Sequence, residues 1–335
     1  MLSLTSVSQM QASRRTFLKG IAGLGLAASG GREAFADTYP NRVIRIIVPT
    51  SPGGGNDTIA RVIGQQLQNS WNQSIIIDNR PGADGTIGAA VVSKSPPDGY
   101  TLMLCTSAVL TINPPLYPNL PYNPLKDFVP ITVASSAPFL LVVHPSLPVN
   151  SVAELIAYAK ANPNKINFSS SGVGSVTHLA GAMFNKMAGI EMVHIPYKGS
   201  APAMTDLLSG RVPLRITVAG GVLPFLKTGE LKALAVTSPD KYSLMPDLPT
   251  IAETVPGYSA SIWYGLVGPA GMPDDIANTL QSEIAKQLKS PEVKAKLDAD
   301  GSQAVGNTPA QFAQMMKSET AQWTTIIRDN NIRPE

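Results

Sequence analysis

The chain has 335 residues, of which 44% are apolar and 15% are charged. This composition excludes an intrinsically disordered protein, and the length suits two domains of about 100 to 150 residues each. The formal net charge of +3 at pH 7 is small for a protein of this size.

The N-terminal segment has the features of an export signal. Residues 13–19 read Ser-Arg-Arg-Thr-Phe-Leu-Lys, the pattern of a twin-arginine signal, and a short apolar stretch and Ala34-Phe35-Ala36 follow. The apolar stretch of about ten residues is too short to span a bilayer. We therefore assign residues 1–36 to a signal peptide that is cleaved after about Ala36.

Cleavage there changes the charge. The leader carries Arg14, Arg15, Lys19 and Arg32 against Glu33, so its removal takes away the three net positive charges and leaves zero. A neutral protein lacks the basic excess that holds phosphate backbones or anionic membranes, so we expect no nucleic-acid partner. No later segment contains roughly 18 uninterrupted apolar residues, so no membrane span is expected.

Along the rest of the chain, short apolar strands alternate with amphipathic helices, a pattern typical of α/β proteins with mostly parallel sheets. Strands are predicted at Val43–Val48, Ser74–Asp78, Thr101–Cys105, Phe139–His144, Ile166–Ser169, Met192–Pro196, Leu214–Val218 and Leu231–Thr237. Helices are predicted at Thr58–Gln68, Gly85–Val92, Val152–Ala161, His178–Met187, Ala201–Leu208, Val222–Leu226, Asp274–Leu288, Pro291–Asp298 and Pro309–Asn330.

Two proline-rich intervals interrupt this pattern, at 113–138 and 239–256. Prolines at this density predict neither a long helix nor a central strand. We interpret the intervals as two crossings between domains. Residues 37–136 and 262–335 would then form a discontinuous first domain, and residues 137–261 the second.

Four loops share one construction, since each follows a predicted strand and opens a helix with small polar residues. They are the glycine loop (residues 51–57), the Asn79–Gly85 loop, the serine loop (residues 169–175) and the Tyr197–Ser200 loop. The start of a helix offers free N–H groups and a positive dipole end to an anion. Because ligands bind at the carboxyl ends of strands in open α/β sheets, the four loops together predict one binding cleft.

Other motif interpretations fail on spacing. None of the loops matches a P-loop, a Gly-x-Gly-x-x-Gly dinucleotide motif or a Gly-x-Ser-x-Gly nucleophile elbow. A single cysteine, Cys105, and three widely separated histidines exclude a cysteine-based zinc site. We expect no cofactor, no metal and no enzymatic activity, and Cys105 is interpreted as a small buried hydrophobe.

Single residues leave alternatives open. Asp57 is expected to cap its helix or anchor its loop more than to contact a ligand. His178 could make a structural hydrogen bond or a ligand contact, and Lys198 could pair with a carboxylate or remain an exposed lysine. Trp263 could line the cleft or pack between the domains.

The chain resembles the extracytoplasmic solute receptors of the tripartite tricarboxylate transporter family, the Bug-type (TctC-like) binding proteins, from about Tyr39 to the C-terminus. The matching segments include Pro52-Gly53-Gly54-Gly55-x-Asp57, Asn79-Arg80-Pro81-Gly82-Ala83, Pro97-Asp98-Gly99-Tyr100, Asp127-Phe128-Val129-Pro130, His178-Leu179-Ala180-Gly181, Pro196-Tyr197-Lys198-Gly199 and Pro249-Thr250-Ile251-Ala252-Glu253.

The resemblance implies a two-domain periplasmic-binding-protein (Venus-flytrap) fold of type II. Such a receptor captures a small carboxylate-bearing solute in the periplasm and delivers it to a transporter of two membrane subunits driven by an ion gradient. A monomer suffices for this role. A sensor that passes its ligand-bound form to a signalling receptor is the alternative function.

The resemblance also implies which residues bind the ligand. It points to residues of the glycine loop, of the serine loop and of the helix start that follows the serine loop, namely Gly53, Gly54, Asp57, Ser170, Ser171, Thr177 and His178. We add Thr50, Ser51, Pro52, Thr106, Ser107, Tyr197 and Lys198, which lie in or beside the same strand-end loops. The chain departs from the family pattern at Thr50, where an aromatic residue is common, and at residues 213–216, which read Pro-Leu-Arg-Ile in place of Asp-Leu-Met-Phe.

Overall fold

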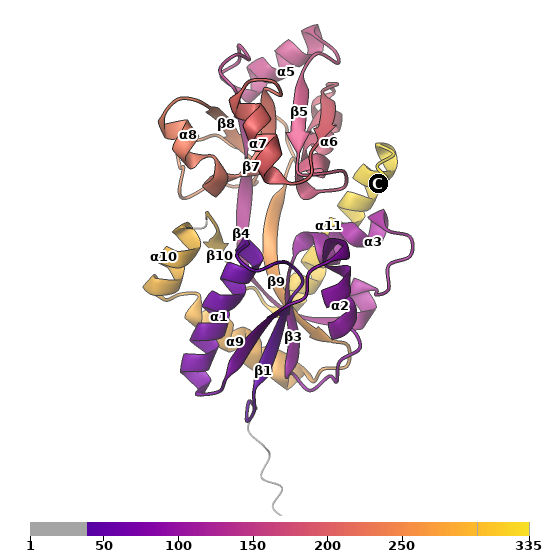
Figure 1. Ribbon diagram of the computed structural model, residues 1–335, viewed down its shortest axis with the longest axis vertical. Coiled ribbons are helices and arrows are strands. Elements are labelled where there is room, and N and C mark those ends of the chain that lie inside the picture. Colours follow the sequence, from indigo (N-terminus) through magenta and orange to yellow (C-terminus); the bar gives the residue numbers. More distant parts are fainter. Residues whose placement is uncertain (1–38, 300, 335) are drawn as a thin grey trace, which may run out of the picture. The chain divides into compact units, whose positions relative to one another are not determined.

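A computed structural model describes residues 39–299 and 301–334 (Figure 1). The predicted twin-arginine signal and its cleavage site lie outside these residues. The chain divides into two units, Met1–Asn41 and Arg42–Glu335, and every helix and strand of the described residues belongs to the second. Within that unit, strands and helices alternate as the α/β interpretation predicts.

The strands are β1 (Ile44–Val48), β2 (Ile75–Asn79), β3 (Thr101–Thr106), β4 (Phe128–Val143), β5 (Asn167–Ser170), β6 (Val193–Pro196), β7 (Leu214–Val218), β8 (Lys232–Val236), β9 (Ser261–Pro269) and β10 (Gln303–Ala304). The α-helices are α1 (Gly55–Trp71), α2 (Thr86–Val92), α3 (Asn113–Leu116), α4 (Pro124–Asp127), α5 (Val152–Ala161), α6 (Val176–Ala188), α7 (Ser200–Leu208), α8 (Leu223–Lys227), α9 (Asp274–Gln287), α10 (Pro291–Ala299) and α11 (Pro309–Asp329).

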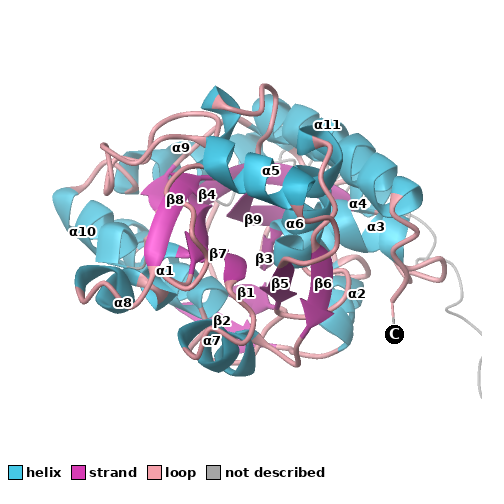
Figure 2. Ribbon diagram, turned by 90° about the horizontal axis from the view of Figure 1, so that it is seen from above, coloured by secondary structure: helices cyan, strands magenta, loops and turns pink. Residues whose placement is uncertain are grey.

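Two groups of parallel strands share two long antiparallel strands. In the first group β1 pairs in parallel with β2 and β3, and in the second β5 pairs in parallel with β6 and β7. Strands β4 and β9 run between the two groups (Figure 1), and β4 pairs with β9 as far as Pro138 and with β7 from Phe139 onward. Helices surround the strands (Figure 2).

Each group of strands has its own buried core, and α11 contributes to both. Phe312 and Met316 of this helix pack with Trp263 in the core that includes β1 and β3. Further along the helix, Trp323 and Ile326 belong to the core around β5 and α6. A single helix of 21 residues therefore ties the two cores together.

The interpretation of residues 128–138 as a segment without a central strand was wrong, because β4 crosses this region as a strand of 16 residues. Its prolines occupy tolerant positions. The pairing of β4 with β9 shifts register between Pro130 and Thr132, and Pro138 is the last residue paired with β9. A residue at such an irregularity does not need an N–H for the ladder.

Strand β9 was missed because its sequence contains two glycines. The ring of Phe312 explains one of them, since a Cβ atom added to Gly265 would lie 2.4 Å from that ring. Glycine at this position therefore allows α11 to pack directly on the strand. The glycine lowers the strand propensity of β9, and the packing of Phe312 explains why it is there.

Candidate functional site

A cleft with a volume of about 760 Å³ lies at the carboxyl ends of strands from both groups. From the first group it is lined by Pro49, Thr50, Ser51, Pro81, Gly82, Ala83, Asp84, Gly85, Thr106, Ala108, Val109, Asn113, Leu116 and Tyr117. From the second group and the crossing strands it is lined by Phe139, Ser171, Gly172, Val173, Gly174, Ser175, Val176, Thr177, Ser200, Thr217, Val218 and Ile262. The volume suits a small molecule.

The glycine loop is held in place by Asp57, which is only 3% exposed. One carboxylate oxygen accepts hydrogen bonds from the Gly53 N–H (3.0 Å) and from Nε of Arg61 (2.9 Å), and the other accepts from Nδ2 of Asn79 (3.0 Å). Burial opposes ionisation of Asp57, but these hydrogen bonds outweigh it and hold the pKa of the carboxyl below its usual range. Asp57 therefore anchors its loop, as expected, and does not line the cleft.

The loop presents only its first residues to the cleft. Thr50 and Ser51 line the cleft, and the Thr50 carbonyl is fixed by a hydrogen bond from Asn79 (3.1 Å). The expected ligand contacts Pro52, Gly53 and Gly54 are exposed, but they do not line the cleft.

The Asn79–Gly85 loop contributes a carboxylate that the sequence interpretation did not nominate. Asp84 lines the cleft and accepts a hydrogen bond from the Tyr117 hydroxyl, while its carbonyl accepts from Asn113 (2.9 Å). Burial and then the neighbouring Asp84 raise the pKa of Tyr117 to about 12, so Tyr117 remains a donor. The loop itself was one of the four predicted; nothing in the sequence pointed to Tyr117.

The serine loop presents donors to the cleft at the N-terminus of α6. Ser175 caps this helix by accepting a hydrogen bond from the His178 N–H (3.3 Å), and the Ser171 N–H donates to Oγ1 of Thr177 (3.2 Å). Ser171, Val176 and Thr177 all line the cleft. The N–H groups of Val176 and Thr177 lie in the first turn, where they have no intrahelical acceptor, so this end of α6 can receive an anion.

Ser170, within the serine loop, and His178, in the first turn of α6, were both expected in the site, but neither lines the cleft. Oγ of Ser170 lies 2.6 Å from Nε2 of His194, and Nδ1 of His178 accepts from the Gly174 N–H (3.1 Å). The two imidazole rings stack with centroids 3.6 Å apart. Burial lowers the pKa of His178 to about 4 and that of His194 to about 3, so both rings are neutral at pH 7.

The remaining expected residues divide between the cleft and its surroundings. Thr106 lines the cleft, whereas Ser107 is buried and does not. The Tyr197 hydroxyl donates to Asp206 (2.6 Å), and Lys198 is an exposed residue of the same loop that does not line the cleft. The same loop ends in Ser200, which was not nominated but does line it.

Two further interpretations can be compared with the structure. Cys105 is fully buried, and burial raises the pKa of its thiol, in agreement with a small hydrophobe. Trp263 is also fully buried, packs edge-on against Phe312 and donates to Glu319 (2.9 Å). Of the two roles considered for Trp263, the structure therefore supports packing.

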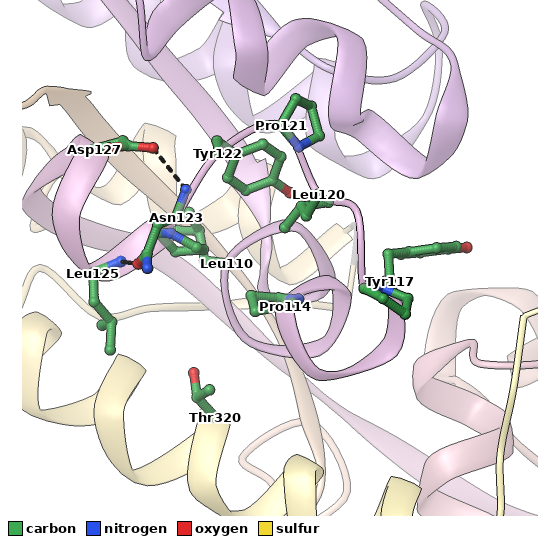
Figure 3. Close-up of a pocket in the computed structure, with 12 residues that line it drawn as sticks. Leu110, Pro114, Tyr117, Leu120, Pro121, Tyr122, Asn123, Leu125, Asp127 and Thr320 are labelled. Atoms are coloured by element: carbon green, nitrogen blue, oxygen red, sulfur yellow. Dashed lines mark hydrogen bonds between the residues drawn. The ribbon is translucent and has the colours of Figure 1, made fainter.

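A second hollow, of about 570 Å³, is formed by the proline-rich segment (Figure 3). Its walls include Pro114, Leu120 and Pro121, and its carboxylate, Asp127, accepts a hydrogen bond from the Asn123 N–H (2.6 Å). No α-helix longer than four residues starts within this lining, so the hollow lacks a helix N-terminus of the kind that α6 provides in the cleft. We therefore place the candidate site in the larger cleft.

Among residues 39–299 and 301–334, no group of three or more His, Cys, Asp or Glu side chains could hold a metal ion. Within the same residues, no helix is both long enough and apolar enough to cross a bilayer.

The sequence model of the family described as "Tripartite tricarboxylate transporter family receptor" matches residues 59–332. The chain belongs to this family. It is 37% identical to "Protein BugT" of Bordetella pertussis over 321 residues, which cover 95% of this chain and 98% of that protein. The two-domain fold of periplasmic binding proteins is therefore the fold of this receptor as well.

Solved structures agree with this assignment. "R. palustris Rpa4515 with adipate" is similar with a TM-score of 0.75 and 38% identity, covering 89% of this chain and all of that one. MatC from Rhodopseudomonas palustris "with bound malate" is similar with a TM-score of 0.71 and 28% identity, covering 86% of this chain and all of that one. Family members of known structure therefore include proteins with bound carboxylates.

Proposed function

We propose that this receptor captures a small carboxylate-bearing solute in its cleft and delivers it to a tripartite tricarboxylate-type secondary transporter. The observation that carries the proposal is the N-terminus of α6, where Ser171 and the first-turn residues Val176 and Thr177 line the cleft. The adipate and malate bound to two relatives support the same ligand class.

In this proposal, residues 37–136 with 262–335 and residues 137–261 form two domains that close on the solute. The closed state gains contacts from both sides of the cleft, so the ligand shifts the population toward closure. Charge-assisted hydrogen bonds in a cleft that excludes water support micromolar affinity, about −8 kcal/mol. The protein acts as a monomer, without a cofactor, after export to the periplasm through its twin-arginine signal.

Thermal unfolding with a panel of mono-, di- and tricarboxylates and aromatic acids tests the ligand class. A ligand at a hundredfold excess over its Kd stabilises the folded state by about 2.7 kcal/mol and raises Tm by several degrees. If no acid of the panel raises Tm, and mass spectrometry of the native protein finds no bound acid, the proposal is wrong.

Uptake of the radiolabelled solute tests the transport role. A strain that lacks the protein should lose uptake and regain it when the gene is restored. Unchanged uptake with a lost transcriptional response to the solute would support a sensor instead.

A further inference from the structure

Arg215 is a fully buried cation next to the cleft. It lies on β7, two residues before Thr217, so the two side chains share one face of the strand. Its Nη1 donates to the carbonyl oxygen of Ser200 (3.1 Å) and its Nη2 to the Ser200 hydroxyl oxygen (2.9 Å). Nε of Arg215 has no hydrogen-bond partner among the described residues.

This cation has no counter-ion among the residues that the structure describes. Within residues 39–299 and 301–334, the ion pairs do not include Arg215. Burial lowers its pKa to about 10, so it remains protonated at neutral pH. A buried charge without a counter-ion is unfavourable, and a nearby anion would offset that cost.

Ser200 connects the cation to the cleft. It is an exposed residue that lines the cleft at the start of α7. Because its oxygen accepts a hydrogen bond from Arg215, its own hydrogen can be donated to a group in the cleft. A donor polarised by a guanidinium makes a stronger bond to an anion than an isolated hydroxyl does.

The two strand groups therefore bring groups of opposite charge to the cleft or next to it. Asp84 and its partner Tyr117 lie on the side of the first strand group, and Ser200 with Arg215 behind it lies on the side of the second. The α6 N-terminus, also in the second group, is a separate position for an anion. Two anion-attracting positions in one cleft suit a solute with two negative charges.

We propose that Arg215, acting through Ser200, is the specificity-determining residue for a second negative charge on the solute, so that the cleft prefers a dianion to a monoanion of equal length. This inference rests on the proposed function, and it deepens it by naming dicarboxylates as the preferred class.

Calorimetric titration of the purified protein at pH 7.5 with adipate, succinate and their monomethyl esters tests the proposal. We expect the wild type to bind a diacid about tenfold or more tightly than its monoester, because a buried cation several ångströms from an anion has an effect of that size. Arg215→Met should reduce this ratio to about threefold or less. Arg42→Met removes an exposed arginine just before β1, at the end of the strand that points away from the cleft. It should leave the ratio of the two affinities unchanged.

The outcomes separate this proposal from the proposed function. If the wild type binds the diacid and the monoester equally well, or binds only monocarboxylates, the dianion preference is overturned while carboxylate binding stands. This outcome is measured on the wild type alone and does not depend on the folding of a variant. An unchanged ratio in folded Arg215→Met also overturns it. If no acid binds at all, both proposals are wrong. Should Arg215→Met fail to fold, Ser200→Ala at the exposed surface should reduce the same ratio.

Discussion

The glycine loop and the serine loop have the same position after a strand and before a helix, but they use their polar groups differently. In the glycine loop, the carboxylate of Asp57 accepts hydrogen bonds from the Gly53 N–H and from the side chains of Arg61 and Asn79. In the serine loop, Ser171 remains at the cleft, next to Thr177 in the first turn of α6. The first loop is therefore held rigidly by its own hydrogen bonds, and we propose that the second provides the main ligand contacts.

The largest expected effect is on stability, at the glycine loop. Asp57→Ala should lower the free energy of unfolding by about 3 kcal/mol, because three donors lose a buried, charged acceptor. Asp57→Asn, which keeps one acceptor oxygen, should lose clearly less. Urea denaturation measures both, and a loss below about 0.5 kcal/mol for Asp57→Ala would contradict the supporting role.

A smaller effect on stability is expected from pH, through the histidine pair behind the serine loop. Burial lowers the pKa of His178 and His194 in the folded protein below the ordinary value of 6.5. Above pH 6.5 the rings are neutral in both the folded and the unfolded protein, so the folded state is fully stable with respect to this pair. As the pH falls from 6.5 toward 4, the unfolded chain takes up protons that the folded state does not, and the free energy of unfolding decreases. We expect the protein to be about 2 kcal/mol less stable at pH 5.5 than at pH 7.

The variant His194→Gln should make this dependence on pH weaker, because it removes one of the two groups that must be neutral. Denaturation curves at both pH values measure the change. An equal pH dependence in the variant and the wild type would show that the pair does not couple folding to protonation.

The carboxylate of Asp84 should weaken the binding of an anionic solute. Asp84→Asn keeps an acceptor for Tyr117 and removes the negative charge, so affinity for a diacid should rise by about three- to tenfold. Calorimetric titration measures this. Weaker binding to the variant would mean that Asp84 contacts the solute favourably.

An effect on affinity of the same size, but of opposite sign, is expected for a single hydroxyl of the serine loop. Ser171→Ala should weaken carboxylate binding by about three- to tenfold and change stability by less than about 0.5 kcal/mol. The matched change in the glycine loop, Ser51→Ala, should have a smaller effect on affinity. The opposite order would reverse the comparison between the two loops.

Local patterns predicted most of the secondary structure. The limits of β7 and α5 agree with the sequence interpretation, because a short buried strand and a helix capped by Ser151 carry their own signals. Strands β4 and β9 were misjudged because their prolines and glycines are tolerated only through contacts with distant residues, such as Phe312.

The sequence predicted which loops form the site, but it did not predict which of their side chains line the cleft. Thr177 and His178 are neighbours in the first turn of α6, yet Thr177 lines the cleft and His178 stacks on His194 behind it. A rotation of about 100° per residue around a helix separates them, and the sequence does not say which of the two faces the cleft. Ser200 was likewise missed beside Lys198, because the sequence does not say which residue of that loop reaches the cleft.

A crystal structure of the receptor with bound adipate tests the central claim most directly. We predict one carboxylate of the diacid within hydrogen-bond distance of Ser171, Thr177 or the first N–H groups of α6, and the other directed toward Ser200. A diacid bound in the proline-rich hollow, or held in the cleft without any contact to the serine loop and α6, would contradict this account.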